Sequence, residues 1–210
     1  MTAPFEQAAA NREVALSLAA MGIAVIPCSP NKRPLITDWS NNASTDTATI
    51  HTGWDTWPFA IPGIPCGVNG LLVVDCDRKN GKDGVALFEA LCAEKGIDLG
   101  HCPMVETPTG GRHYYFRQPT SDVLRNTAGA IGPGVDTRGE GGQVIAPGAT
   151  LPDGRTYHFA SGTLSEVPEI PEALRRVIGE ATKSRAATSS NVKCGFRFKP
   201  AGYSDLKPAG

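Results

Sequence analysis

Long apolar runs are missing from the sequence: none approaches the roughly 18 residues that a membrane-spanning helix needs, and no charged segment followed by an apolar block opens the chain. The six cysteines are scattered without a C-x-x-C pair, which excludes a zinc knuckle and a thioredoxin-type motif. An excess of one charge sign is also missing. The formal net charge of -1 argues against a uniformly basic nucleic-acid coat but allows a local basic cleft. We therefore expect a cytoplasmic protein with reduced thiols and no membrane contact.

Several motifs of nucleotide and metal chemistry are absent as well. The only Gly-Lys pair is followed by Asp83 instead of serine or threonine, so there is no phosphate-binding loop. A dinucleotide fingerprint that starts at Gly139 would need glycine where Val144 stands. Counted from Asp75, the fifth position of an EF-hand loop is Lys79, which offers no oxygen ligand. Nor is there a Gly-x-Ser-x-Gly nucleophile elbow.

What is present fits one globular domain with a tail: 210 residues, of which 40% are hydrophobic and 20% charged. Periodicity, glycine stops and turn residues predict the elements that follow. They are a helix over 5–21, a strand over 23–27, a hairpin over 64–77 that turns at Asn69-Gly70, a helix over 84–95, strands over 104–109, 112–118, 142–148 and 155–160, and a closing helix over 171–181. This order indicates an α+β fold with a largely antiparallel or mixed sheet.

Beyond residue 180 the sequence becomes rich in Ala, Ser, Thr and Lys and loses its apolar period. Basic residues outnumber acidic ones there, since Asp205 is the only carboxylate after Lys183. We expect residues 1–180 to form the functional domain. Residues 181–210 are expected to be a basic, flexible linker or the start of a further domain.

The stretch "NGLLVVDCDRKNG", residues 69–81, ends a buried strand in two carboxylates. Asp75 and Asp77 are two apart, so they share one face of the strand and repel each other. One interpretation is a solvated turn in which Asp77 caps the next helix. The other is a divalent-metal site at the carboxyl end of the strand.

Two further glycine-framed motifs carry candidate residues. In "TPTGGRHYYF", the amides of Gly110 and Gly111 can form an anion-binding nest beside His113, although the motif taken alone favours an ordinary glycine turn with His113 half buried and hydrogen-bonded. In "GPGVDTRGEGGQVIAP", Asp136 and Arg138 share a face if extended, or form a surface ion pair. Three carboxylates with a histidine and an arginine are the groups that two-metal phosphoryl transfer uses.

These motifs give the sequence a family resemblance. "GIAVIP" and "NKRPL", then "LLVVDCD", "GGRHYYF" and "GVDTRGEGGQVIAP" occur in that order. The sequence resembles the bifunctional primase-polymerase domain of the archaeo-eukaryotic primase superfamily, which opens plasmid and phage replication proteins. The resemblance covers about residues 8–178. It implies a two-part domain with an RRM-like sheet and an active site in the cleft between the parts.

The resemblance also implies roles for individual residues. Asp75, Asp77 and Asp136 would be the catalytic carboxylates that bind Mg²⁺ or Mn²⁺ in a two-metal site, and His113 would contact the phosphates of the incoming nucleotide. Arg138, Lys32 and the two glycines of the second motif are further candidates for nucleotide binding. Some relatives carry a cysteine and histidine insertion that binds zinc. His101-Cys102 is the only such cluster here, so we expect no structural zinc.

The resemblance favours a template-directed nucleotidyltransferase that makes and extends primers on single-stranded DNA from nucleoside triphosphates. A helicase domain often follows in the family. The alternative is a replication initiator or single-strand-binding module without catalysis, for which Tyr114 and Tyr115 would have to be exposed on the sheet. Such a module needs no acidic triad, and carboxylates without metal would repel nucleic acid. The three aspartates therefore favour the enzyme.

Overall fold

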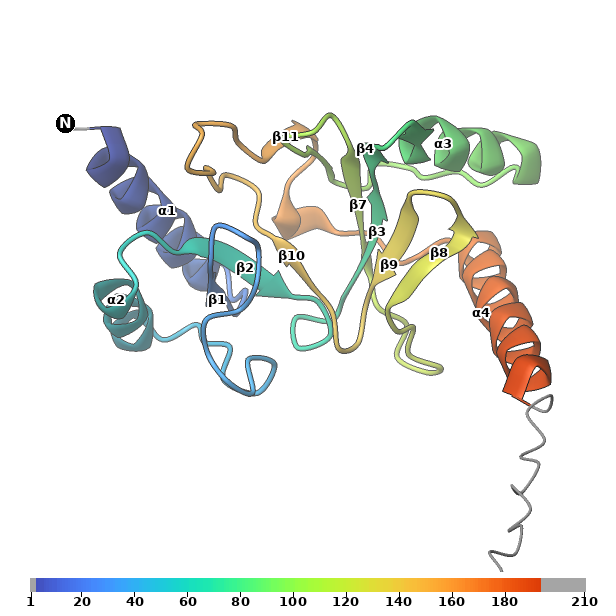
Figure 1. Cartoon of the computed structure of the whole chain (residues 1–210), viewed down its shortest axis with the longest axis horizontal. Helices are drawn as coiled ribbons and strands as arrows, with labels where there is room; N and C mark the ends of the chain where they lie inside the picture. Colours follow the sequence, from blue (N-terminus) through green and yellow to red (C-terminus); the bar gives the residue numbers. More distant parts are fainter. Residues whose placement is uncertain (1–2, 194–210) are drawn as a thin grey trace, which may run out of the picture.

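The computed structural model describes residues 3–193, and positions 1–2 and 194–210, the latter within the predicted 181–210 segment, lie outside the described residues. Two sheets and four α-helices make up the bulk of the fold (Figure 1). The elements are α1 (Ala3–Ala20), β1 (Ile26–Cys28), α2 (Thr47–Thr56), β2 (Ile61–Pro65), β3 (Leu71–Cys76), β4 (Arg78–Lys79), β5 (Lys82–Asp83), α3 (Gly84–Lys95), β6 (Met104–Glu106), β7 (Arg112–Arg117), β8 (Thr127–Gly132), β9 (Val135–Arg138), β10 (Gln143–Ile145), β11 (His158–Ser161), the 3-10 helix η1 (Leu164–Glu166) and α4 (Glu172–Lys193).

The larger sheet has six strands in the order β11-β6-β7-β3-β9-β8, and each strand pair is antiparallel. Side chains alternate across β3, so Leu72 and Val74 face one side while Val73 and Asp75 face the other. The side with Leu72 and Val74 packs with α3 and α4 into one buried apolar cluster that includes Phe88 and Leu174. This face of the sheet is therefore closed by helices, and the face with Asp75 is the one that can hold a site.

The smaller sheet has three strands in the order β1-β2-β10 and carries α1 and α2. It lies beside the open face of the larger sheet, on the left in Figure 1. Val73, Val105 and Tyr115 of the larger sheet join the apolar cluster of this part. The expected α+β fold in two parts is thus confirmed, and a space remains between the sheets where apolar contacts give way to the aspartates.

Local sequence signals predicted both ends of one helix correctly. The helix predicted over 84–95 is α3, whose first turn is capped by the Asp83 carboxylate, which accepts a hydrogen bond from the Ala86 amide (2.9 Å). It stops at Gly96 in the left-handed conformation (φ 62°), a conformation that glycine adopts without strain. Because Asp83 is the cap, Asp77 is not, and the interpretation of Asp77 as a helix cap is wrong.

The prediction of a β-hairpin over residues 64–77 is also wrong. A turn does form at Asn69-Gly70, but β2 joins the small sheet and β3 joins the large one. The Asn69 side chain explains the divergence: its oxygen accepts from the Ala24 amide (2.7 Å), and its nitrogen donates to the carbonyls of Ala24 (2.9 Å) and Pro65 (2.7 Å). These bonds tie the turn to the start of β1 instead of folding β2 onto β3.

Two other differences follow from composition. The glycine-rich stretch before residue 139 forms the hairpin β8–β9, which the sequence did not predict because glycine has low strand propensity. The closing helix, expected to end at residue 181, continues to Lys193, since Ala and Lys are good helix formers. In the part of the chain that the structure describes, no helix has both the length and the apolar character to cross a membrane.

We predict that Asn69→Ala lowers the free energy of unfolding by about 2 kcal/mol, because three hydrogen bonds of roughly 1 kcal/mol each are lost and part of that loss is regained through water. Urea unfolding of the full chain, followed by circular dichroism, measures the change. Asn41→Ala is the control: Asn41 is exposed and donates only to Asp38, so its loss should stay within about 0.5 kcal/mol. Equal stability of the two variants would contradict the anchoring role.

Candidate active site

Asp75, His113 and Asp136 form one row across three neighbouring strands. In the register of the sheet, Asp75 on β3 is directly opposite His113 on β7 and directly opposite Asp136 on β9. Directly opposed residues hold their Cβ atoms about 4.5–5.5 Å apart, so the row is fixed by backbone pairing alone. The His113 Nε2 atom lies 3.4 Å from an oxygen of Asp75.

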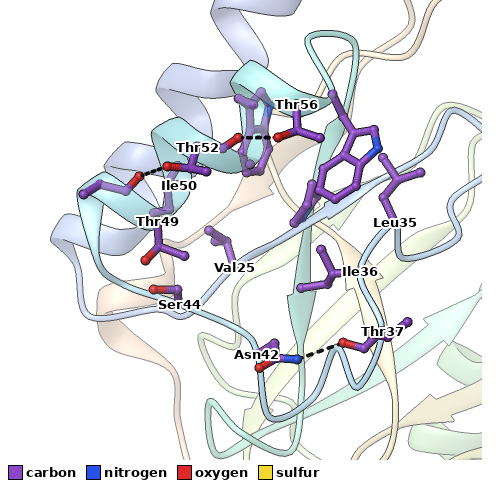
Figure 2. A pocket seen from close by; sticks show the side chains of 15 residues that line it. Val25, Leu35, Ile36, Thr37, Asn42, Ser44, Thr49, Ile50, Thr52 and Thr56 are labelled. Carbon is purple, nitrogen blue, oxygen red and sulfur yellow. Dashed lines mark hydrogen bonds between the residues drawn. The ribbon is translucent and has the colours of Figure 1, made fainter.

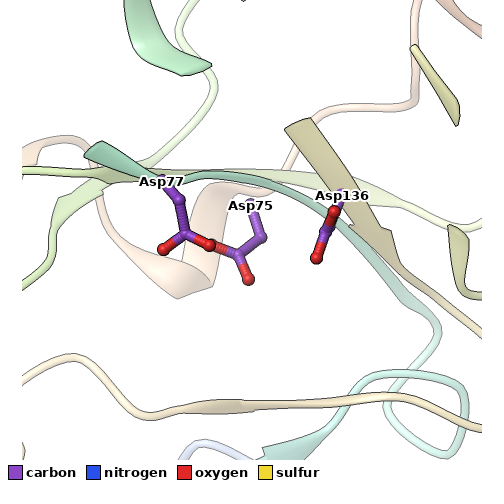
Figure 3. Close-up of side chains that lie close together, drawn as sticks. All are labelled: Asp75, Asp77 and Asp136. Carbon is purple, nitrogen blue, oxygen red and sulfur yellow. The ribbon is translucent and has the colours of Figure 1, made fainter. Parts of the chain in front are cut away.

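Asp77 follows immediately after β3 and completes the group. Its amide donates to the Gly134 carbonyl (2.8 Å), and its carbonyl accepts from the Gly84 amide (2.9 Å), so its backbone is held on both sides. One carboxylate oxygen from each of Asp75, Asp77 and Asp136 lies within 4.8 Å of the others. Figure 3 shows the three side chains, with Asp75 near the end of β3, Asp77 just beyond that strand and Asp136 on the neighbouring β9. The predicted convergence of the carboxylates is confirmed; their role as metal ligands stays a proposal.

Arg138 bridges two of the carboxylates. One terminal nitrogen of its guanidinium lies 2.8 Å from an oxygen of Asp136 and 3.3 Å from an oxygen of Asp75. The other oxygen of Asp136 accepts a hydrogen bond from the Gly129 amide on β8 (2.8 Å). The predicted pairing of Asp136 with Arg138 on one face is confirmed, and Arg138 reaches Asp75 as well.

Asp75 is the most enclosed of the three carboxylates, with a side chain that is 15% exposed. Burial is the largest influence on it and favours the protonated form, but the hydrogen bond and charge of His113, followed by those of Arg138, outweigh burial and lower the pKa of Asp75 to about 2. Asp75 is therefore ionised at neutral pH, which is the state that a metal ligand needs.

The remaining carboxylate, Asp77, forms an ion pair with Lys79. The hydrogen bond to Asp77 is the main reason why the pKa of Lys79 is raised above its ordinary value. Lys79 was not among the residues singled out from the sequence. The signal was nonetheless present, because Asp75, Asp77 and Lys79 continue the same two-residue period that places side chains on one face.

A cleft of about 450 Å³ between the two sheets is lined by Asp75, Asp77, Lys79 and Arg138, and Asp136 lies opposite Asp75 on the neighbouring strand. The smaller sheet supplies its opposite wall through Gln143, Val144 and Ile145 of β10. Thr107 and Thr109 add hydroxyls near the start of β7, and Tyr157 adds an aromatic ring. No sequence motif pointed to Tyr157, because it comes from a distant segment whose place depends on how the chain passes between the sheets.

Lys32 also lines the cleft, as the K-x-P loop suggested. Its ammonium nitrogen lies 5.4 Å from the centre of the Tyr157 ring, within the range of a cation–π contact. Its carbonyl accepts a hydrogen bond from the Gln143 side chain (2.9 Å), which ties the loop to β10. A lysine is thereby placed across the cleft from the aspartates.

His113 is buried, with ring contacts to Tyr157 (centroids 5.8 Å apart) and Tyr115 (6.2 Å). Its Nδ1 atom has no hydrogen-bond partner among the residues that the structure describes. Buried polar atoms normally have a partner, so a ligand or water is the natural one here. His113 thus holds Asp75 with one nitrogen and keeps the other unpaired.

Gly110 and Gly111 lie in the turn between β6 and β7 and are not among the residues that line the cleft. The Gly110 amide donates to the Thr107 carbonyl (2.9 Å), so it already has a partner. A Cβ atom on Gly111 would lie 2.4 Å from the Cys76 carbonyl oxygen. Close packing of the turn against the end of β3 therefore accounts for glycine at position 111, independently of any phosphate.

A second hollow, of about 750 Å³, lies between α2 and the loop over residues 35–44 (Figure 2). None of the described residues that line it is charged, and Leu35, Ile36 and Trp57 contribute apolar surface. The hydroxyls of Thr52 and Thr56 donate to carbonyls of their own helix, at 2.9 Å each. This hollow offers neither carboxylates nor cations, so the charged cleft between the sheets is the candidate active site.

The comparisons with known proteins agree with this geometry. Residues 15–173 match the family described as bifunctional DNA primase/polymerase, N-terminal. This match covers more than half of the chain, and the chain belongs to that family. A search of curated proteins finds no match. Enzymes of the family are metal-dependent and act on DNA and nucleotides in replication, and membership of the family supports a primase/polymerase function for this chain.

We predict that Gly111→Ala destabilises the protein by about 1–3 kcal/mol, because the new methyl group meets a backbone oxygen that cannot move without shifting β3. Chemical unfolding of the full chain measures this loss. Gly179→Ala on α4 is the matched control: nothing lies within 4 Å of the new atom, and alanine should stabilise the helix by about 0.5–1 kcal/mol. A Gly111→Ala variant as stable as the wild type would contradict the close packing.

Proposed function

We propose that this chain is a template-directed nucleotidyltransferase, a DNA primase and DNA polymerase, that uses two divalent metal ions, Mg²⁺ or Mn²⁺, in the replication of a phage or plasmid. The reaction is attack of a 3′-hydroxyl on the α-phosphate of a nucleoside triphosphate, with release of pyrophosphate. The observation that carries the proposal is the group of three carboxylates whose oxygens lie within 4.8 Å of one another, two of which, Asp75 and Asp77, line a cleft between two sheets.

The donor set fits the metals. Mg²⁺ and Mn²⁺ prefer oxygen ligands, and Asp75, Asp77 and Asp136 supply them from a rigid part of the larger sheet. When bound, two such ions stabilise the attacking and the leaving oxygens of an in-line displacement. The residues of the chain contribute position: backbone pairing fixes two of the carboxylates, and the backbone contacts of Asp77 fix the third.

The cations of the cleft suit a triphosphate. Arg138 lines the cleft from β9, and Lys32 lines it from the loop that Gln143 ties to β10, so they can neutralise phosphate oxygens from two sides. We assign His113 the same purpose, because it lines the cleft beside Asp75. For Gly110 and Gly111 we retain only a supporting role, since the Gly110 amide is already engaged by Thr107.

The alternative of a non-catalytic binding module is less well supported. It requires exposed aromatic rings on the sheet for base stacking, whereas Tyr114 and Tyr115 are 3% and 0% exposed. The open face of the sheet instead presents carboxylates, which repel a nucleic-acid backbone unless cations neutralise them. An acidic cluster in the cleft is useful to a metal-dependent enzyme and costly to a simple binder.

We further propose that residues 1–180 are sufficient as the catalytic domain and that the basic 181–210 segment helps to hold the template or leads into another domain, such as a helicase. Lys183 begins the basic part of this segment and lies on α4, at the right of Figure 1. Each basic residue that neutralises a phosphate would strengthen binding in a salt-dependent manner without touching the chemistry.

We predict that Asp75→Asn and Asp136→Asn each lower the rate of primer extension about a thousandfold or more. Metal ions contribute several kcal/mol to such reactions, and each 1.36 kcal/mol is tenfold in rate. The assay follows extension of a labelled primer on single-stranded DNA with Mg²⁺ or Mn²⁺. Asp98→Asn, on an exposed loop, should extend at the wild-type rate. Single-strand binding, measured by fluorescence anisotropy, should be kept or strengthened in both active-site variants. Extension that survives either substitution would overturn the proposed function.

We also predict that His113→Ala raises the nucleotide KM, or lowers kcat, by about tenfold or more, since a hydrogen bond to a charged group contributes about 1.5–3 kcal/mol. Template affinity should stay within about twofold of wild type. His158→Ala, an exposed histidine on β11 of the same sheet, is the control and should change neither quantity. An equal loss of template binding in His113→Ala would move this residue to the DNA path.

A further inference from the structure

The short hairpin β4–β5 projects a lysine onto the metal-binding carboxylates that we propose. Its strands pair only with each other, as a two-stranded sheet, and its turn places Asn80 (φ 54°) and Gly81 (φ 73°) in the left-handed region. This is the turn that suits a tight hairpin. Arg78 anchors the base through the Gly110 carbonyl (3.2 Å) and Asp83 (2.9 Å). Lys79, the next residue, reaches into the cleft.

Each carboxylate of the cluster has a cationic partner from the chain. Arg138 pairs with Asp75 and Asp136, and Lys79 pairs with Asp77. Three carboxylates so close together would otherwise repel one another strongly, because little water screens them. In this structure the two side chains therefore supply the positive charge that a divalent metal would also supply.

The two cations differ in how firmly they are held. The Arg138 guanidinium contacts two carboxylates and its side chain is 31% exposed. The Lys79 ammonium contacts one, and its side chain is 58% exposed. A lysine is a point charge on a flexible stem, whereas the planar arginine fork is suited to fixed bridging. Of the two, Lys79 is the one that can leave its carboxylate at little cost.

We propose that Lys79 is an exchangeable counter-ion: it neutralises Asp77 in the metal-free protein, leaves when a divalent metal binds, and then contacts the triphosphate of the incoming nucleotide. This inference rests on the proposed function and adds a nucleotide-binding residue to it. A metal ion and an ammonium group compete for the carboxylate of Asp77, and their like charges repel. The released ammonium stays in a cleft where the triphosphate is the new source of negative charge.

The proposal predicts that Lys79→Met changes the affinity for metal and the affinity for nucleotide in opposite directions. In Lys79→Met the competitor for Asp77 is gone, so Mn²⁺ alone should bind several-fold more tightly. The same variant has lost a triphosphate contact, so a nucleotide should bind several-fold more weakly once metal is present. A residue that merely supported the structure would weaken both, and a residue outside the site would change neither.

The experiment uses the full chain. Electron paramagnetic resonance measures Mn²⁺ binding without nucleotide, and calorimetry measures binding of a non-hydrolysable α,β-imido deoxynucleoside triphosphate at saturating Mn²⁺. Lys79→Arg keeps the charge and should restore nucleotide binding at least in part. Lys82→Met is the matched control, because Lys82 is directly opposite Lys79 in the hairpin but is not among the residues that line the cleft.

Tighter Mn²⁺ binding together with weaker nucleotide binding in Lys79→Met, and wild-type values in Lys82→Met, would support the proposal. Unchanged or weaker Mn²⁺ binding, or unchanged nucleotide binding, in Lys79→Met would overturn it. Asp136→Asn distinguishes a failure of the counter-ion role from a failure of the proposed metal site. If Asp136→Asn loses Mn²⁺ while Lys79→Met behaves as wild type, only the counter-ion role fails. If Asp136→Asn keeps full Mn²⁺ affinity, the proposed metal site itself fails.

Discussion

The constraint on which the structure depends is the mutual repulsion of three carboxylates held at the end of one strand and on its neighbour. Backbone pairing sets Asp75 opposite Asp136, and the chain direction sets Asp77 beside them, so the side chains cannot separate without breaking the sheet. Directly opposed like charges destabilise a sheet. Arg138 and Lys79 offset this cost in the protein as it stands. The close approach of the three carboxylates lowers the stability of the metal-free protein, and the same arrangement suits a divalent cation.

The path of the chain between the two sheets explains why the site forms a cleft. The segment from β9 to β10 leaves the larger sheet just after Arg138 and enters the smaller sheet at Gln143. One continuous motif therefore supplies a carboxylate on one wall and the facing wall as well. The segment from β2 to β3 makes the opposite passage, and the Cys66 amide donates to the Gly142 carbonyl where the two segments meet (2.8 Å). The two passages join the sheets beside the cleft.

The sequence predicted the features that are encoded locally. The helix over 84–95 followed from its apolar period and from Gly96, and the shared face of Asp75 and Asp77 followed from strand alternation. The hairpin over 64–77 failed because three hydrogen bonds of Asn69 to distant backbone decide where β2 goes. Such contacts have no local signature. The place of Tyr157 in the site was not predicted for the same reason, since only the folded chain brings its ring to His113.

The family assignment rests on the order and spacing of sequence motifs. The proposed metal-binding role of Asp75, Asp77 and Asp136 rests on their carboxylate chemistry and on the close approach of their oxygens. A crystal of the full chain soaked in Mn²⁺ and measured at the manganese absorption edge tests that role most directly. If the aspartates bind metal, an anomalous peak will lie about 2.0–2.6 Å from oxygens of Asp75, Asp77 and Asp136, the range of metal-oxygen bonds. An anomalous map without a peak at these carboxylates, from a crystal at saturating Mn²⁺, would contradict it.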